Sequence, residues 1–417
     1  MTPTDTLQEL RPDAEPFIAL RRDIHRHPEL AFQEERTAAL VARLLEEWGY
    51  EVERGIGVTG VVGRLRRGAG ARRLGLRADM DALPIQEPPG RDHASRRPGV
   101  MHACGHDGHT AMLLAAAKYL AQKGRFSGTL NVIFQPAEES GGGALRMIED
   151  GLFDRFPCDA IFAMHNMPGL AQGHLLFREG PALASCDDVT ITLAGTGGHG
   201  AAPHRAADPV VGAAAIVTAL QTIVSRNVDP LQPAVITVGA FNAGVAHNVI
   251  PSTATLKLSV RALDSAVRDL LEQRICALVD AQAAGFGLQA SVDYRRGYPV
   301  LVNAPVQTQL AREAALALLP ADRITLQGPA FTGSEDFAFM LERCPGSYLL
   351  IGNGDGERGS ACMIHNPGYD FDDGNVLVGS AYWVCLAQRY LCPPMPQGRE
   401  PSLANHSTPA DLSESPA

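Results

Sequence analysis

No apolar segment of this chain is as long as a membrane span, and no cysteine pattern points to a secreted protein. The longest apolar runs, around residues 111–117 and 210–219, are short and rich in alanine, whereas a spanning helix needs roughly 20 apolar residues. The N-terminal stretch lacks the basic and apolar regions of a secretory signal. The eight cysteines are scattered without framework spacing, which is typical of reduced thiols. We therefore expect a cytoplasmic protein that binds no membrane.

An excess of positive charge is also missing. Lys and Arg number 36 against 46 Asp and Glu, which gives a net charge of −10. A nucleic-acid-binding protein needs a basic surface that displaces counterions from phosphates. The only dense basic patch, at residues 91–97, is interrupted and reads as a loop. We therefore expect a small-molecule substrate and no nucleic-acid partner.

The length of 417 residues exceeds what one hydrophobic core usually holds, so we expect two domains. In the first 186 residues, apolar runs that predict strands alternate with segments of helical spacing. The runs are 60–63, 74–77, 130–134 and 160–164, and the helical segments are 40–48, 108–122 and 143–151. This alternation predicts an α/β fold with a central mixed sheet, mostly parallel and covered by helices.

A second domain is predicted between residues 187 and 297. Its pattern of strand, helix, two strands, helix and strand is the order of a ferredoxin-like sandwich. The segments are 189–193, 208–226, 235–240, 254–262, 265–284 and 289–295. The larger domain is then discontinuous, formed by residues 1–186 and 298–393, and residues 394–417 are expected to be a disordered tail.

The densest chemical signal is Met-His-Ala-Cys-Gly-His-Asp-Gly-His at residues 101–109. It places three imidazoles and a thiol within nine positions, and these groups are preferred ligands of zinc and neighbouring transition metals. Cys104 and His106 can reach a common ion only from a bent loop, which Gly105 permits. The alternative, capping histidines beside an inert buried cysteine, is disfavoured by the clustering.

Two adjacent carboxylates, Glu138 and Glu139, follow the apolar run 130–134. Neighbouring side chains on an extended backbone point in opposite directions. One carboxylate can therefore bind a metal while the other faces the substrate as a general base.

Other candidate side chains also follow apolar segments. His165 and His365 each come just after such a run, although either one alone would more often be structural. Asp79 and Asp81 stand two apart at another strand end, where they could support a ligand histidine.

Eight short motifs occur in an order that resembles the amidohydrolase branch of the aminoacylase/carboxypeptidase-type dinuclear metallopeptidases. This branch includes hippurate hydrolases and plant auxin-conjugate hydrolases. The motifs are RADMDALP, MHACGHDGH, QPAEE, MHN, GGHGAAPH, HNVIP, SEDFA and IHNP, spread over about residues 15–395. No single motif is specific, but the eight in order are. The resemblance implies a catalytic domain and an inserted lid domain, in agreement with the layout above.

The resemblance also implies a role for each matching residue. Grouped by role, these are Cys104, His106, Glu139, His165 and His365 for two metal ions, Glu138 and His199 for catalysis, Asp79 and Asp81 for orienting the ligands, and Asn248, Arg261 and Gly333 for the substrate. Cys104 would bridge the ions, and Glu138 would be the general base. His199 would stabilise the tetrahedral intermediate, in its own or a neighbouring protomer's site.

The implied reaction is metal-dependent hydrolysis of N-acyl amino acids, hippurate-like or N-acetylated, to a carboxylic acid and a free amino acid. The ions would be Mn²⁺ or Zn²⁺, and Co²⁺ or Ni²⁺ also suit the ligand set. A dipeptidase or carboxypeptidase reaction is the alternative within the same family. The sequence leaves open the acyl preference and whether the lid forms a homodimer or homotetramer.

Two other classes compete with this interpretation. A cysteine amidase would use Cys104 as nucleophile but leaves Glu138, Glu139, His165 and His365 without a role. A non-catalytic protein that senses or carries an amino acid would need no general base, yet Glu138 is present. We therefore favour the hydrolase.

Overall fold

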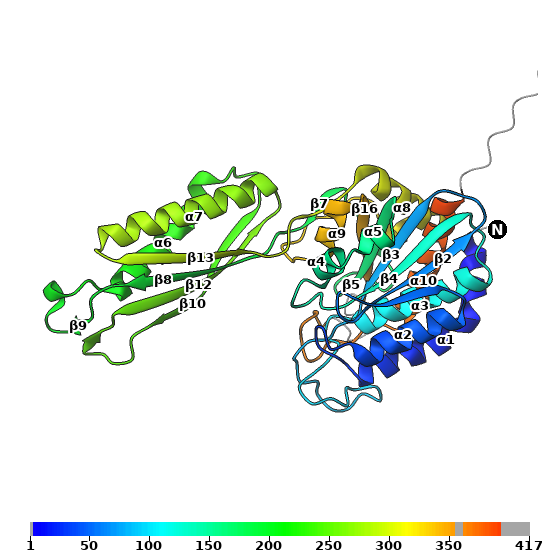
Figure 1. Cartoon of the computed structure of the whole chain (residues 1–417), viewed down its shortest axis with the longest axis horizontal. Helices are drawn as coiled ribbons and strands as arrows, with labels where there is room; N and C mark the ends of the chain where they lie inside the picture. The colour runs from blue at the N-terminus through cyan, green and yellow to red at the C-terminus, as the bar shows by residue number, and fades with distance from the viewer. Residues whose placement is uncertain (1–2, 355–361, 393–417) are drawn as a thin grey trace, which may run out of the picture.

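The chain folds into a larger and a smaller domain that lie end to end along the long axis of the molecule (Figure 1). The computed structural model describes residues 3–354 and 362–392, so the predicted tail at 394–417 lies outside the described residues. The smaller domain is inserted between β7 (Gly180–Leu183) and β14 (Leu301–Asn303), which pair with each other beside the two connecting segments.

A mixed sheet of eight strands forms the centre of the larger domain. In spatial order these are β1 (Glu51–Ile56), β2 (Gly60–Arg67), β4 (Gly128–Gln135), β3 (Arg73–Asp79), β5 (Ala160–Met167), β16 (Gly346–Gly352), β6 (Leu175–Leu176) and β15 (Ile324–Thr325). The four strands from β4 to β16 are mutually parallel, and antiparallel pairs flank them. These strands are almost wholly buried because both faces of the sheet are covered.

Helices pack on both faces, and alternate residues of β5 belong to two separate cores. One layer contains α1 (Pro3–Arg26), α2 (Glu35–Glu47), α3 (His106–Gln122), α8 (Pro305–Leu318) and α10 (Gly374–Leu391). The other contains α4 (Gly143–Glu149), α5 (Leu152–Arg155) and α9 (Phe337–Arg343). Alanines let α3 pack closely against α10, where a Cβ on Gly379 would lie 2.1 Å from the Met112 sulfur.

The smaller domain is an antiparallel sheet with two helices on one face (Figure 1). Its elements are β8 (Asp187–Ala194), α6 (Pro209–Asn227), β10 (Ala234–Ala243), β12 (Thr253–Ala262), α7 (Ser265–Gly285) and β13 (Gln289–Arg296). The strand order β10-β12-β8-β13 is that of a ferredoxin-like sandwich. Alternating Val189, Ile191 and Leu193 point into the core beneath the helices. The predicted fold class, including the inserted ferredoxin-like domain, is confirmed.

Short elements complete the two domains. At the far tip of the smaller domain, β9 (Gly198–His199) pairs with β11 (Val249–Ile250), and the turn η1 (Pro203–Arg205) lies close by. The turn η2 (Ala321–Arg323) leads into β15 of the larger domain. The tip therefore carries one of the motifs that the sequence assigned to catalysis.

Helix α6 corrects one expectation from the sequence. It is 19 residues long with a mean hydropathy of 1.4, so by length and composition it could cross a membrane. Its buried residues, among them Ile216, Leu220 and Ile223, instead pack on the small sheet. Its exposed residues include Thr218 and Gln221 as well as Val210 and Val211.

Candidate metal centre and active site

The predicted site residues converge at the carboxyl ends of the parallel strands. Asp79 ends β3, Glu138 and Glu139 follow β4, and His165 lies near the end of β5. A cavity of about 770 Å³ opens there, and its wall includes residues of both domains. This is the edge where open α/β sheets bind ligands, because several loops leave the strands together.

The structure brings the five predicted metal ligands together around Cys104. One group is Cys104, His106 and His165, and the other is Cys104, Glu139 and His365, with the ligand atoms of each group within 4.8 Å of one another. The Cys104 Sγ lies 3.3 Å from the His165 Nε2, and the His365 Nε2 lies 3.2 Å from a Glu139 oxygen. Cys104 is thus common to two sets of donors, as a bridging ligand would be.

The donor atoms fit a divalent metal centre. The Nε2 of His106 is fully buried and has no hydrogen-bond partner among the described residues, and it faces Glu139 at 3.9 Å. A buried polar atom without a partner is costly unless an ion or water binds it. Thiolate, imidazole and carboxylate ligands in one cluster suit zinc and its neighbours.

Two of the predicted ligand histidines, His106 and His165, are each oriented by a contact to their Nδ1 atom. The His106 Nδ1 lies 3.1 Å from an Asp81 oxygen, and the other Asp81 oxygen accepts a hydrogen bond from the Glu139 amide at 2.9 Å. The His165 Nδ1 lies 2.6 Å from the Asn166 carbonyl oxygen. These contacts leave both Nε2 atoms facing the cluster, the usual arrangement of a metal-bound histidine.

His109, the third histidine of the 101–109 motif, packs beside the cluster, with its ring centroid 4.5 Å from that of His165. Its Nδ1 lies 2.6 Å from an Asp79 oxygen, and its Nε2 accepts a hydrogen bond from the Asn166 amide at 3.0 Å. Both ring nitrogens are therefore occupied. Asp79 also pairs with Arg77 at 2.6 Å, and the same carboxylate oxygen lies 3.9 Å from the His106 Nε2.

The Cys104–His165 contact does not resemble a nucleophilic pair. Burial raises the pKa of the Cys104 thiol well above its usual value, and the carboxylates of Glu139 and Glu138 add to the shift. Burial and then His109 lower the pKa of His165 well below its usual value. A thiolate nucleophile needs the opposite shifts, with an acidic thiol beside a cationic imidazole.

Glu138 lies among other carboxylates at the cavity wall. Burial raises the pKa of Glu138 well above its usual value, and Glu335, Glu139 and Asp336 reinforce the shift. Arg77 partly balances this charge because its Nη2 lies 2.8 Å from Glu335 and 3.2 Å from Asp336. Arg77, Glu335 and Asp336 were not predicted to have a role, although a lone arginine inside a buried strand was a usable signal.

His199 and the three residues predicted to bind substrate are divided between two places. Arg261 and Gly333 line the cavity, and the Arg261 Nη1 donates to the Ser334 hydroxyl at 2.9 Å across the domain boundary. His199 and Asn248 instead lie exposed at the tip of the smaller domain, joined by a 2.8 Å bond from the Gly200 amide to the Asn248 carbonyl. In this arrangement of the domains they do not line the cavity with the predicted metal ligands, and their roles stay predictions.

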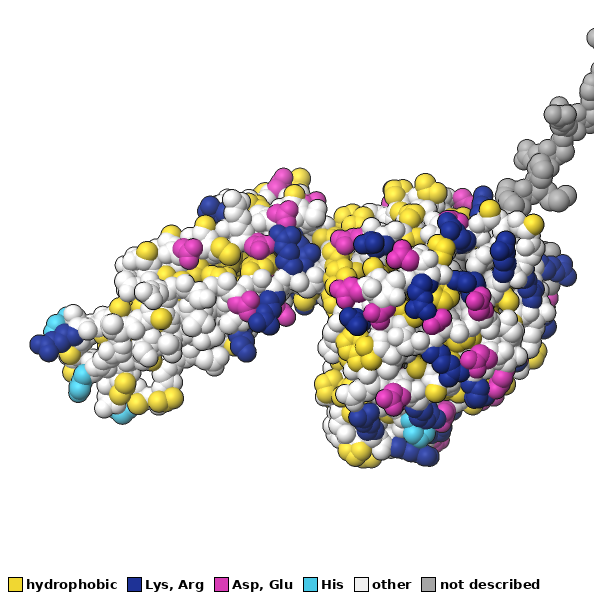
Figure 2. Space-filling model, in the orientation of Figure 1, with side chains coloured by type: hydrophobic (Ala, Val, Ile, Leu, Met, Phe, Trp, Pro, Cys, Tyr) yellow, Lys and Arg dark blue, Asp and Glu magenta, His cyan; other side chains and the backbone are white. Residues whose placement is uncertain are grey.

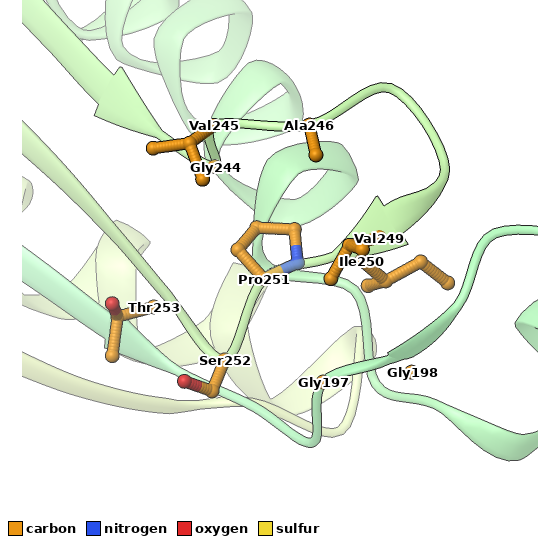
Figure 3. Close-up of a pocket in the computed structure, with 10 residues that line it drawn as sticks. All are labelled: Gly197, Gly198, Gly244, Val245, Ala246, Val249, Ile250, Pro251, Ser252 and Thr253. Carbon is orange, nitrogen blue, oxygen red and sulfur yellow. The ribbon is translucent and has the colours of Figure 1, made fainter.

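The tip has its own open hollow of about 680 Å³ (Figure 3). Its ten lining residues, Gly197, Gly198, Gly244, Val245, Ala246, Val249, Ile250, Pro251, Ser252 and Thr253, include no titratable group. Histidine and arginine side chains gather nearby at the tip (Figure 2). The hollow has none of the groups that the cavity between the domains provides for chemistry.

Comparisons with known proteins identify the family of this chain. The family model described as peptidase family M20/M25/M40 matches residues 75–389. The chain belongs to this family. It is 44% identical to a hippurate hydrolase of Campylobacter jejuni over 90% of this chain and 96% of that protein. It is 40% identical to an N-acetyl-L-cysteine deacetylase of Bacillus subtilis over 90% of this chain and 88% of that one.

Solved structures of the M20 family agree with the fold. A dinuclear metal-binding M20 peptidase of Bacillus subtilis matches with a TM-score of 0.79 at 34% identity, over 91% of this chain and 99% of that one. A Staphylococcus aureus structure matches with a TM-score of 0.86 at 33% identity, over 93% of this chain and all of that one. The predicted class, a metal-dependent amidohydrolase of this family, is confirmed.

Proposed function

We propose that this M20 amidohydrolase cleaves the amide bond of N-acyl amino acids and releases a carboxylic acid and a free amino acid. The observation that carries the proposal is one cavity that holds the metal-ligand cluster, Glu138 and Arg261 together. Two relatives with more than a third of their residues identical are named for such substrates, hippurate and N-acetyl-L-cysteine. Both substrates carry an amide beside a free carboxylate.

The metal centre would be held by the five residues that the structure clusters, which are Cys104, His106, Glu139, His165 and His365. Two divalent ions bound there would lower the pKa of a water molecule and polarise the substrate carbonyl. Mn²⁺ or Zn²⁺ fits these donors, and Co²⁺ or Ni²⁺ is also compatible. Binding would displace the proton that the buried Cys104 thiol otherwise keeps.

Glu138 would move the proton that the reaction requires. Its carboxylate lines the cavity directly beside the ligand cluster. It would take a proton from the attacking water and deliver it to the nitrogen of the leaving amine, which is general base and then general acid catalysis. Glu335 and Asp336, held by Arg77, would keep its carboxyl basic enough to accept that proton.

Arg261 would bind the free carboxylate of the amino-acid half. Its guanidinium reaches the cavity beside Gly333 and Ser334, and a planar fork of N–H donors suits a carboxylate. Apolar residues also line the cavity, among them Leu183, Phe331 and Leu350, and would contact the acyl group.

A carboxypeptidase-type reaction is the second candidate. A relative named thermostable carboxypeptidase 2, from Saccharolobus solfataricus, is 35% identical over 99% of its length. A peptide with a free C-terminal carboxylate would engage Arg261 in the same way. The two candidates therefore differ in the acyl half of the substrate and not in the catalytic groups.

His199 and Asn248 would contribute only from a different arrangement. From the tip of the smaller domain they could reach a substrate after the domain rotates toward a cavity, in this protomer or in a second copy. There, His199 would stabilise the developing oxyanion and Asn248 would bind substrate.

The test is hydrolysis of a panel of N-acyl amino acids and dipeptides by metal-stripped enzyme, with and without added Mn²⁺ or Zn²⁺. The proposal predicts metal-dependent release of amino acid, with N-acyl amino acids preferred over dipeptides. Undiminished activity after metal removal would point to a thiol amidase. A preference for dipeptides would favour the carboxypeptidase reaction.

A further inference from the structure

The turn that carries the predicted general base is fixed by three side chains from elsewhere in the chain. Ala137 has a positive φ of 52°, a left-handed conformation that a non-glycine residue rarely adopts. Its amide donates to Glu34 at 2.9 Å, and the Glu139 amide donates to Asp81 at 2.9 Å. Between them, the Glu138 carbonyl oxygen accepts a 2.6 Å hydrogen bond from the Tyr298 hydroxyl.

Tyr298 differs from the other two because it belongs to the segment that connects the domains. It follows Gly297, where the chain returns from the smaller domain. The Gly297 amide donates to the Cys186 carbonyl at 3.0 Å, and the Cys186 amide donates to the Tyr298 carbonyl at 3.0 Å. The two connecting segments are thus paired on each other directly at Tyr298.

The smaller domain anchors this pair through Asp187. The Arg268 Nε lies 3.0 Å from one Asp187 oxygen and 3.1 Å from the other, and Tyr294 and the Gly297 amide also donate to Asp187. Asp187 and Arg268 are both buried, so this charge-assisted contact is shielded from water. The position of Gly297, and hence of Tyr298, is therefore set from the small-domain side.

The Tyr298 side chain also contacts the larger domain. Its ring packs edge-on against Phe339 of α9, with centroids 6.0 Å apart. Burial raises the pKa of Tyr298, and the carboxylates of Asp336, Glu138 and Glu335 add to the shift. The hydroxyl therefore stays protonated and remains a donor over the whole pH range in which an enzyme works.

We propose that Tyr298 is a positioning residue for Glu138, through which the connecting segments of the smaller domain fix the backbone of the general base. The inference rests on the proposed role of Glu138. Without the Tyr298 hydroxyl, the turn at residues 137–139 loses one of the three side-chain hydrogen bonds that hold it. The Glu138 carboxylate then samples positions away from the reacting water. Catalysis by a misplaced base falls steeply, because an error near 1 Å costs up to about 100-fold.

The test compares Tyr298→Phe with Tyr298→Leu and with the control Tyr50→Phe. Tyr50 also donates its hydroxyl to a backbone carbonyl, that of Ala117 at 2.9 Å, but in the helical layer away from the cavity. We expect Tyr298→Phe to lower kcat about 10-fold with KM within about twofold, at unchanged bound metal. Tyr50→Phe should match wild type in kcat, although it should lose about as much thermal stability as Tyr298→Phe.

Each outcome decides the question. A wild-type kcat in Tyr298→Phe overturns the proposal, and a loss confined to Tyr298→Leu would show that the ring and not the hydroxyl matters. A rise in KM alone, or loss of metal, would assign Tyr298 to substrate or metal binding and also contradict it. Glu138→Gln distinguishes failure of the proposed role of Glu138 from failure of the proposed role of Tyr298. If Glu138→Gln keeps its activity, both proposals are wrong, because the role of Tyr298 depends on that of Glu138.

Discussion

Replacing Glu34 with glutamine should stabilise the metal-free protein at neutral pH. Glu34 is fully buried, and burial raises its pKa from 4.5 to about 7, with the charge of Asp81 adding to the shift. The Thr59 hydroxyl and the Ala137 amide donate to it at 2.6 and 2.9 Å and offset only part of this cost. Glutamine can keep both contacts, because its oxygen accepts from Ala137 and its NH₂ donates to Thr59.

The direction with pH follows from the raised pKa. The folded state holds the Glu34 proton more tightly than the unfolded chain, so this group favours unfolding increasingly as pH rises from 4.5 to about 7. Above pH 7 the penalty is constant. A difference of about 2.5 pKa units corresponds to about 3 kcal/mol, since each unit is worth about 1.4 kcal/mol.

The assay is urea unfolding of metal-free wild type and Glu34→Gln between pH 4.5 and 8. The variant should match wild type near pH 4.5 and exceed it by up to about 3 kcal/mol above pH 7. Glu47→Gln, at the exposed end of α2, the helix that begins directly after Glu34, controls for the loss of one charge. Stability curves of wild type and Glu34→Gln that stay parallel over this range would refute the reasoning.

Three further changes test other parts of the structure. Asp81→Asn should weaken metal binding about 10- to 100-fold, because His106 loses its orienting carboxylate, as metal content after dialysis would report. Arg261→Met should raise the KM for N-acyl amino acids at least about 10-fold in steady-state kinetics. The KM for substrates whose carboxylate is amidated should stay the same. Gly379→Ala should destabilise the protein by about 1–3 kcal/mol in thermal unfolding, because its methyl group collides with Met112.

Most of the fold could be predicted from local patterns. Alternation in the segment 189–193 and continuous apolar runs such as 130–134 gave the right strands, and Gly49 ends α2 with a φ of 87° as a helix-terminating glycine does. Helix α1 could not be predicted in this way. Pro12 and Pro16 lie inside it, and proline normally interrupts a helix. Packing of α1 against α3 and α10 outweighs that local preference.

The clustering of the candidate metal ligands could be predicted from the order of the strands and the motifs that follow them. Cys104 and the other ligands follow neighbouring parallel strands, so the topology forces them to one edge of the sheet. The place of His199 relative to the metal ligands could not be predicted, because the sequence carries no information on the angle between the domains. Arg77 and Glu335 were missed because they are 258 positions apart and act by pairing with each other.

The central claim is that Glu138 moves the proton at an intact metal centre. The most direct measurement is hippurate hydrolysis by Mn²⁺-loaded wild type and Glu138→Gln, with bound metal quantified in both. The account predicts equal metal content and a kcat reduced at least about 100-fold in the variant. A variant that keeps its metal and hydrolyses hippurate at the wild-type rate would contradict it.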